Sequence, residues 1–102
     1  VALHMAESPI GAMAAVHVGA ALPQLMCMEY HSVDVPYWQD VVNGLPRPLI
    51  DHGFITVPDA PGLGIESLNE ELIEKLVCKN IPGVWEPTDN WDNDICNDRL
   101  WS

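Results

Sequence analysis

The stretch Leu25–His31 carries the side chains best suited to chemistry, because an apolar run ends there in Glu29 and His31. As a β-strand it would alternate its side chains between two faces, which places Leu25, Cys27, Glu29 and His31 together. In α/β barrels, catalytic groups sit at the carboxyl ends of the strands, where the loops gather. The pattern therefore predicts either an acid–base site or an ordinary core strand that runs out into solvent.

The composition excludes several classes of protein. The chain has 102 residues, of which 48% are hydrophobic, so it suits one small folded domain and not a disordered segment. A net charge of −11 argues against a nucleic-acid or anionic-lipid partner. No apolar run reaches the roughly 18 residues that span a bilayer. The three cysteines are widely spaced without a CxxC motif, which favours a reducing, cytoplasmic setting over a disulfide framework or zinc knuckle.

The elements around the central stretch follow a strand–helix–strand order. Val1–His4 is typical of a strand end, and without an initiator Met we expect the chain to begin inside a larger protein. Ser8 as a cap and Pro9 at the first helical position predict a helix over Ile10–Leu22, apolar nearly all round and therefore buried. His17 within it is interpreted as packed or hydrogen-bonded and not as a ligand. This order predicts a βαβ unit with parallel strands and an α/β fold class.

A long connection follows the second strand. Ser32–Pro48 is rich in proline, with a helical turn predicted near Tyr37–Val42, and connections of this length are often functional. Alternating apolar residues predict a hairpin over Leu49–Val57. Its turn contains His52, which is expected to be solvated.

The last third of the chain begins with a turn-rich segment, Pro58–Gly64. Ser67 and Glu70 have the spacing of a capping box, which predicts a short helix through Val77. The acidic residues of the tail over 81–102 lack the later Gly and Glu of a calcium-binding loop. A solvated tail held to a partner surface by its tryptophans is favoured over a calcium site.

Several of these features together resemble one protein family. His4 at a strand end, Glu29 at the next strand end and the motif Pro61-Gly62-Leu63-Gly64 resemble the C-terminal part of the mandelate racemase/muconate lactonizing enzyme family of the enolase superfamily. Glu29–Pro36 and the ending Asp98–Ser102 look most like sugar-acid dehydratases related to galactonate dehydratase. The resemblance covers essentially the whole chain.

The resemblance implies a C-terminal fragment of a modified (β/α) TIM-type barrel, plus a returning hairpin and helix segment that packs on a capping domain. Residues 1–48 would hold the last two strand–helix units and the following loop. Residues 49–102 would hold the hairpin, the PGLG segment, the short helix and the acidic, tryptophan-containing tail. It also implies the rest of the same polypeptide as a partner, an even-numbered homo-oligomer, and Mg²⁺ whose ligands lie outside this chain.

The resemblance also implies roles for individual side chains. His4 would be a general acid/base, which suits imidazole because its ordinary pKa lies near neutral pH. Glu29 would hydrogen-bond the substrate carboxylate, which requires Glu29 to be protonated or to share a proton, as burial favours. His31 would line the substrate pocket, and the loop Asp34–Trp38 would wall its polar end. A structural role for His4 and an ion pair for Glu29 remain the alternatives.

The implied reaction is a Mg²⁺-dependent dehydration of an aldonic sugar acid to a 2-keto-3-deoxy acid through an enediolate. A small-molecule sugar acid is thus the expected substrate. A racemase or epimerase of the same superfamily is the alternative within the fold, and a non-catalytic fragment or relative is the alternative outside it. The second-strand bases that would distinguish these possibilities are not in this chain.

Overall fold

The computed structural model describes residues 1–32 and 34–77. The chain divides into two compact units, residues 1–70 and 71–102. The tail over 81–102, with the predicted contact of its tryptophans and the alternative calcium site, lies outside the described residues. None of the helices in the described part is long and apolar enough to cross a membrane.

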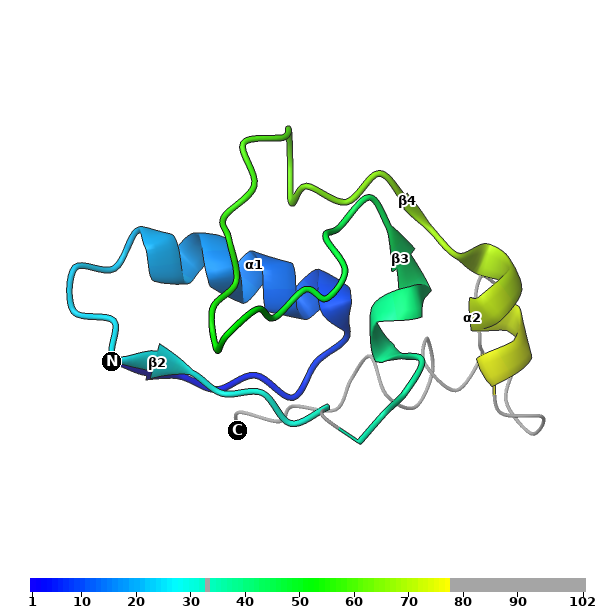
Figure 1. The fold of residues 1–102 in the computed structure, drawn as a ribbon, viewed down its shortest axis with the longest axis horizontal. Coiled ribbons are helices and arrows are strands. Elements are labelled where there is room, and N and C mark those ends of the chain that lie inside the picture. The colour runs from blue at the N-terminus through cyan, green and yellow to red at the C-terminus, as the bar shows by residue number, and fades with distance from the viewer. Residues whose placement is uncertain (33, 78–102) are drawn as a thin grey trace, which may run out of the picture. The chain divides into compact units, whose positions relative to one another are not determined.

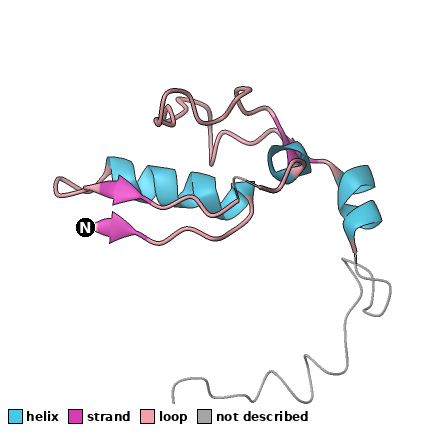
Figure 2. Ribbon diagram, turned by 60° about the horizontal axis from the view of Figure 1, so that its bottom comes forward, coloured by secondary structure: helices cyan, strands magenta, loops and turns pink. Residues whose placement is uncertain are grey.

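The first unit opens with a parallel βαβ arrangement, as predicted. Strand β1 (Ala2–Leu3) pairs with β2 (Cys27–Met28), and α1 (Pro9–Ala20) connects them. Figure 1 labels α1 and β2, and Figure 2 shows the two strands side by side with α1 along one face. The strands are shorter than the expected Leu25–His31, yet backbone hydrogen bonds continue on both sides of them. Met26 N donates to Val1 O at 2.7 Å, and Glu29 N donates to Leu3 O at 2.9 Å.

Helix α1 begins where the sequence predicts, but not by the predicted contact. Ser8 is the cap residue with extended backbone angles, yet its side chain makes no capping hydrogen bond. The Ser8 carbonyl instead accepts from Ala12 N at 3.0 Å, and Pro9 supplies a first helical residue that needs no N–H partner. One face of α1 is buried: Pro9, Ala12, Met13, Val16 and Gly19.

The opposite face of α1 corrects the expectation of burial all round. Ile10 is 38% exposed and Val18 is 52% exposed. The segments of the described chain that pack on α1 reach only one side of it, so the apolar residues of the other side stay in contact with water. An apolar, solvated helix face of this kind is unfavourable unless another surface covers it.

The core joins α1 to the long connection through Trp38. This residue begins a short 3₁₀ helix, η1 (Trp38–Val41), close to the predicted turn near 37–42. The Trp38 side chain is 7% exposed, and its Nε1 donates to Glu7 O at 2.8 Å, a bond worth about 1 kcal/mol. The other buried apolar side chains are Met5, Ala12, Met13, Val16, Val42, Leu45 and Leu49.

A second, antiparallel pair corrects the capping-box prediction. Strand β3 (Val42–Asn43) pairs with β4 (Ser67–Leu68), so Ser67 lies in a strand and not at a helix cap. Its Oγ accepts a hydrogen bond from Asn43 Nδ2 at 3.0 Å. Helix α2 (Glu70–Leu76) begins three residues later. The capping pattern is local, whereas the pairing of Val42 with Leu68 is set by a segment 26 residues away and prevails.

The predicted hairpin over 49–57 is reduced to a single bridge between Asp51 and Phe54. The two residues between them, His52 and Gly53, have positive φ values of 48° and 84°. Positive φ at both central positions is the pattern of a type I′ turn. The turn was thus predicted correctly, but no extended strands form on either side of it in the described structure.

Gly44 provides a test of the β3–β4 pairing, with Gly53 as a matched control. Both have positive φ, 94° and 84°, so alanine adds similar backbone strain at each. A Cβ at Gly44 would lie 2.9 Å from the backbone N of Glu66, whereas a Cβ at Gly53 meets nothing within 4 Å. Chemical denaturation of the complete protein is expected to show a cost of about 1 kcal/mol for Gly53→Ala and at least about twice that for Gly44→Ala. Equal costs would contradict the close approach of β3 to Glu66.

Candidate functional site

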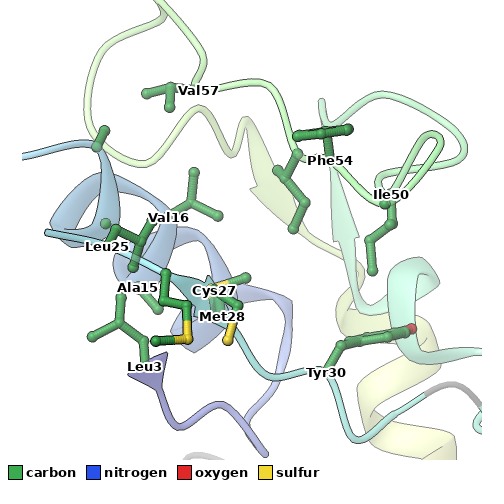
Figure 3. Close-up of a pocket in the computed structure, with 15 residues that line it drawn as sticks. Leu3, Ala15, Val16, Leu25, Cys27, Met28, Tyr30, Ile50, Phe54 and Val57 are labelled. Carbon is green, nitrogen blue, oxygen red and sulfur yellow. The ribbon is translucent and has the colours of Figure 1, made fainter. Parts of the chain in front are cut away.

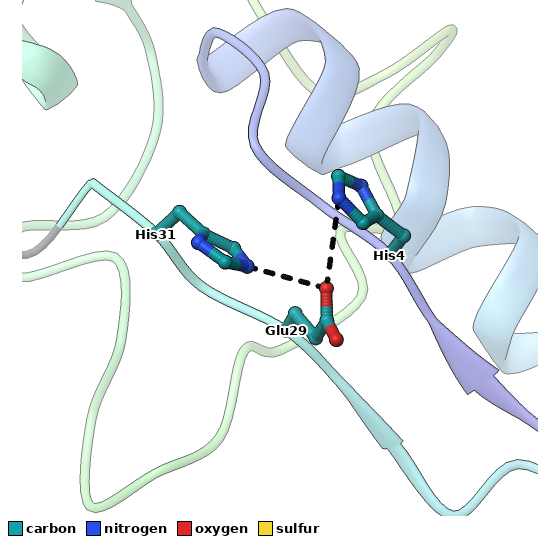
Figure 4. Close-up of side chains that lie close together, drawn as sticks. All are labelled: His4, Glu29 and His31. Carbon is teal, nitrogen blue, oxygen red and sulfur yellow. Dashed lines mark hydrogen bonds and ion pairs between the residues drawn. The ribbon is translucent and has the colours of Figure 1, made fainter.

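His4 and Glu29 face each other at the ends of the two parallel strands. Each residue directly follows its own strand, and the two strands pair in a register that sets Leu3 beside Met28. Because partners in a parallel pair point to the same side of the sheet, both side chains leave the face opposite α1. His4 Nε2 lies 3.9 Å from Glu29 Oε2. Figure 4 shows the two side chains pointing toward one another.

His31 joins this pair more closely than the sequence indicates. Its Nε2 lies 3.3 Å from the same Glu29 Oε2, and its ring stacks on the His4 ring with centroids 5.6 Å apart. The sequence placed His31 on the face of Glu29 and expected it to line a pocket. The direct contact follows from the i, i+2 spacing of the two residues, whereas the stacking on His4 requires the pairing of distant segments.

The three side chains are accessible to solvent in this chain. The exposed fractions of the side chains are 76% for His4, 45% for Glu29 and 57% for His31. The burial expected for Glu29 is therefore not supplied by the described residues. The remaining route, in which Glu29 shares a proton, has a partner at hand in the imidazole of His31.

Tyr30 fixes the backbone between Glu29 and His31. Its ring packs edge-on against Trp38, with centroids 5.2 Å apart and an interplanar angle of 71°. Because Trp38 belongs to the core, this contact ties the cluster to the most buried part of the unit. The expectation that the loop Asp34–Trp38 walls the site is therefore wrong for Trp38, since burial of its large ring against α1 places it inside.

The other two histidines lie apart from the cluster. His52 is in the exposed turn, as expected, and its Nδ1 pairs with Asp51 Oδ1 at 2.7 Å. His17 is half-buried on α1, and its Nε2 is buried with no hydrogen-bond partner in the described part of the chain. This agrees with a packed histidine.

The residues present do not fit Mg²⁺. Within residues 1–32 and 34–77, one group of three side chains could hold a metal ion: His4, Glu29 and His31. Mg²⁺ prefers six oxygen ligands, whereas this group offers two nitrogens and one carboxylate. The expectation that magnesium ligands lie outside this chain stays a prediction.

An apolar groove of about 510 Å³ lies on the other side of β2. Figure 3 shows Val16 of α1, Met28 of β2 and Phe54 of the following segment along it. No side chain lining this groove is charged. A sugar acid has many hydroxyls and a carboxylate, so the groove does not suit it as a binding site.

Comparison with known proteins assigns the class. Residues 1–72 match the family model described as enolase C-terminal domain-like. The chain therefore belongs to this family, as the sequence resemblance predicted, and its parallel βαβ unit is a fragment of a TIM-type barrel. The described residues form no closed barrel, and they contain one pair of parallel strands.

Three curated relatives show how far the similarity reaches. D-xylonate dehydratase of Haloferax volcanii is 43% identical over 65 residues, covering 64% of this chain and 15% of the relative. A D-galactonate dehydratase family member, RspA of Pantoea ananatis, is 35% identical over 78 residues, covering 76% and 18%. The o-succinylbenzoate synthase of Bacillus subtilis is 41% identical over 61 residues, covering 59% and 16%. The chain thus spans less than a fifth of the length of each. No solved structure matches it significantly.

Proposed function

We propose that this chain is part of a Mg²⁺-dependent dehydratase that converts an aldonic sugar acid into a 2-keto-3-deoxy acid. The observation that carries the proposal is the convergence of His4 and Glu29 at the carboxyl ends of neighbouring parallel strands. The names of two relatives, a D-xylonate dehydratase and a D-galactonate dehydratase family member, favour a sugar acid as substrate. The magnesium ligands, the remaining strands and the capping domain belong to the rest of the polypeptide.

His4 is assigned to proton transfer. Its Nε2 takes the proton from the carbon next to the substrate carboxylate, or gives a proton to the departing 3-hydroxyl, which leaves as water. Both steps need a group whose two protonation states are accessible near neutral pH, and imidazole is such a group. The exposed ring of His4 can be reached by a substrate from the side opposite α1.

Glu29 is assigned to the substrate carboxylate. Two ionised carboxylates at contact distance repel each other, so Glu29 must present a proton between them. His31, with its Nε2 at 3.3 Å from Glu29 Oε2, is placed to supply or share this proton. His31 is therefore a positioning residue for Glu29 in this proposal, next to its expected role in lining the substrate pocket.

The test uses the complete protein with Mg²⁺ and a panel of aldonic acids in D₂O. Formation of a 2-keto-3-deoxy acid supports the proposal. Exchange of the α-proton without loss of water would replace it by the racemase or epimerase alternative. If the Mg²⁺-bound protein gives neither the 2-keto-3-deoxy acid nor α-proton exchange, the non-catalytic alternative holds.

The chain by itself is not expected to unfold cooperatively as a monomer. Ile10 and Val18 are exposed on the outer face of α1. In the described structure, β1 and β2 pair only with each other, so each has one unpaired edge. Unpaired edges and apolar faces favour association with further surfaces, which the rest of the same polypeptide would supply. Thermal unfolding followed by circular dichroism, combined with sedimentation, checks this. A sharp transition in a monomeric sample would contradict it.

A further inference from the structure

We propose that His4, Glu29 and His31 form a binding site for a borderline transition-metal ion, with Zn²⁺ as the best match. The three side chains offer two imidazole nitrogens and one carboxylate oxygen, all within 4.8 Å of one another. Figure 4 shows both rings turned toward the Glu29 carboxylate. This site is distinct from the magnesium site, whose oxygen ligands would come from outside this chain.

The spacing of the donor atoms is close to that of a tetrahedral site. With bonds near 2.0–2.2 Å, two ligands of Zn²⁺ lie roughly 3.3 Å apart. His31 Nε2 is already 3.3 Å from Glu29 Oε2, and His4 Nε2 is 3.9 Å from it. The two imidazole nitrogens lie within 4.8 Å of each other, so His4 needs to approach by at most about 1.5 Å to complete three corners of the tetrahedron. Its exposed side chain has the freedom to do so.

The donor types select the metal. Imidazole is a good ligand for Zn²⁺ and a poor one for Mg²⁺, which keeps oxygen ligands and water. Two neutral histidines and one carboxylate leave a bound Zn²⁺ with a charge of +1 and an open fourth position for water or a substrate carboxylate. The solvent-accessible side chains give the ion a route of entry.

Occupation by Zn²⁺ has a chemical consequence for His4. The lone pair on Nε2 that would accept a proton forms the bond to the metal instead, so metal binding and proton transfer exclude each other. Zn²⁺ is therefore expected to inhibit the proposed reaction at concentrations that leave Mg²⁺ bound. Metal binding itself does not depend on the proposed reaction and can be measured without it.

The experiment titrates the complete, chelator-treated protein with Zn²⁺ by calorimetry in excess Mg²⁺, which occupies oxygen-ligand sites. His31→Gln is expected to weaken Zn²⁺ binding by at least about 10-fold, since it removes a ligand. His52→Asn is the matched control: it removes an exposed histidine that has a single acidic partner, Asp51, and asparagine tolerates the positive φ of 48°. Its Zn²⁺ affinity is expected to equal that of the wild type.

A second measurement uses the unaltered protein, so a misfolded variant cannot obscure the result. Zn²⁺ should shift the imidazole ¹⁵N resonances of His4 and His31 in NMR spectra and leave those of His17 and His52 in place. Absence of these shifts, or equal Zn²⁺ binding by the wild type and His31→Gln, would overturn the proposal. A protein that dehydrates sugar acids with Mg²⁺ but binds no Zn²⁺ would overturn this inference alone, and a protein that binds Zn²⁺ but dehydrates no sugar acid would overturn the proposed function alone.

Discussion

Replacing His4 with glutamine is expected to lower kcat for dehydration by about 10²–10⁴-fold, the usual loss when a general acid or base is removed. Its Nε2 faces Glu29 at 3.9 Å, and its exposed ring makes little contribution to the core. Stability should therefore change by no more than about 0.5 kcal/mol. Product formation and α-proton exchange with D₂O, measured together, identify the step. Loss of both indicates that His4 takes the α-proton, whereas retained exchange indicates that it protonates the leaving hydroxyl.

The control for this variant is His52→Asn, which also removes one exposed histidine. The Asp51–Phe54 turn lies outside the cluster, so dehydration should proceed at the wild-type rate. If His4→Gln dehydrates at the wild-type rate, His4 takes no part in the reaction. The structural role, which is the alternative that the sequence left open, would then apply.

Glu29 is expected to respond differently to glutamine and to alanine. Glu29→Ala removes the contact with the substrate carboxylate and should lower kcat by about 10²–10³-fold, as for the loss of one hydrogen-bond donor to developing negative charge. Glu29→Gln keeps a donor of nearly the same shape and should retain more activity than Glu29→Ala. Steady-state kinetics of both variants at saturating Mg²⁺ give the comparison.

The order of these two Glu29 variants tests the proton that the proposal assigns to Glu29. A glutamine variant as inactive as the alanine variant would show that the ionised carboxylate is required, as in an ion pair with His4 or His31. If Glu29→Ala and Glu29→Gln both keep the wild-type kcat, the substrate carboxylate does not bind at Glu29. His31→Gln should resemble Glu29→Gln in direction, because it removes the group placed to share the proton.

The sequence was sufficient where local rules apply. Alternation along 25–31 predicted that Glu29 and His31 share a face, and the strand–helix–strand order predicted the parallel pairing that brings Glu29 beside His4. The position of the turn at His52 was also predicted from neighbouring residues, and its positive φ values agree with a tight turn. The shared face and the turn depend on side-chain periodicity and backbone preferences within a short stretch, whereas the parallel pairing follows from the order of the elements along the chain.

The sequence was insufficient where distant segments decide. Ser67 lies in β4 and not at a helix cap because β3 competes for its backbone. Trp38 is in the core because α1 and the 3–8 segment offer it a buried place and an acceptor at Glu7. The outer face of α1 remains exposed because the surfaces that its apolar pattern anticipates are not among the described residues. No local pattern contains this information.

The backbone hydrogen bonds that join Val1 to Met26 and Leu3 to Glu29 impose unequal tolerance to insertions. Extra residues in the connection between α1 and β2 can loop outward, because they leave the strand pairing unchanged. A single residue added between Leu3 and His4 would turn the imidazole to the side of the sheet that α1 covers, since side chains alternate with a period of two. Length variation in this family should therefore gather in the 21–24 connection and avoid the few residues on either side of the strand ends.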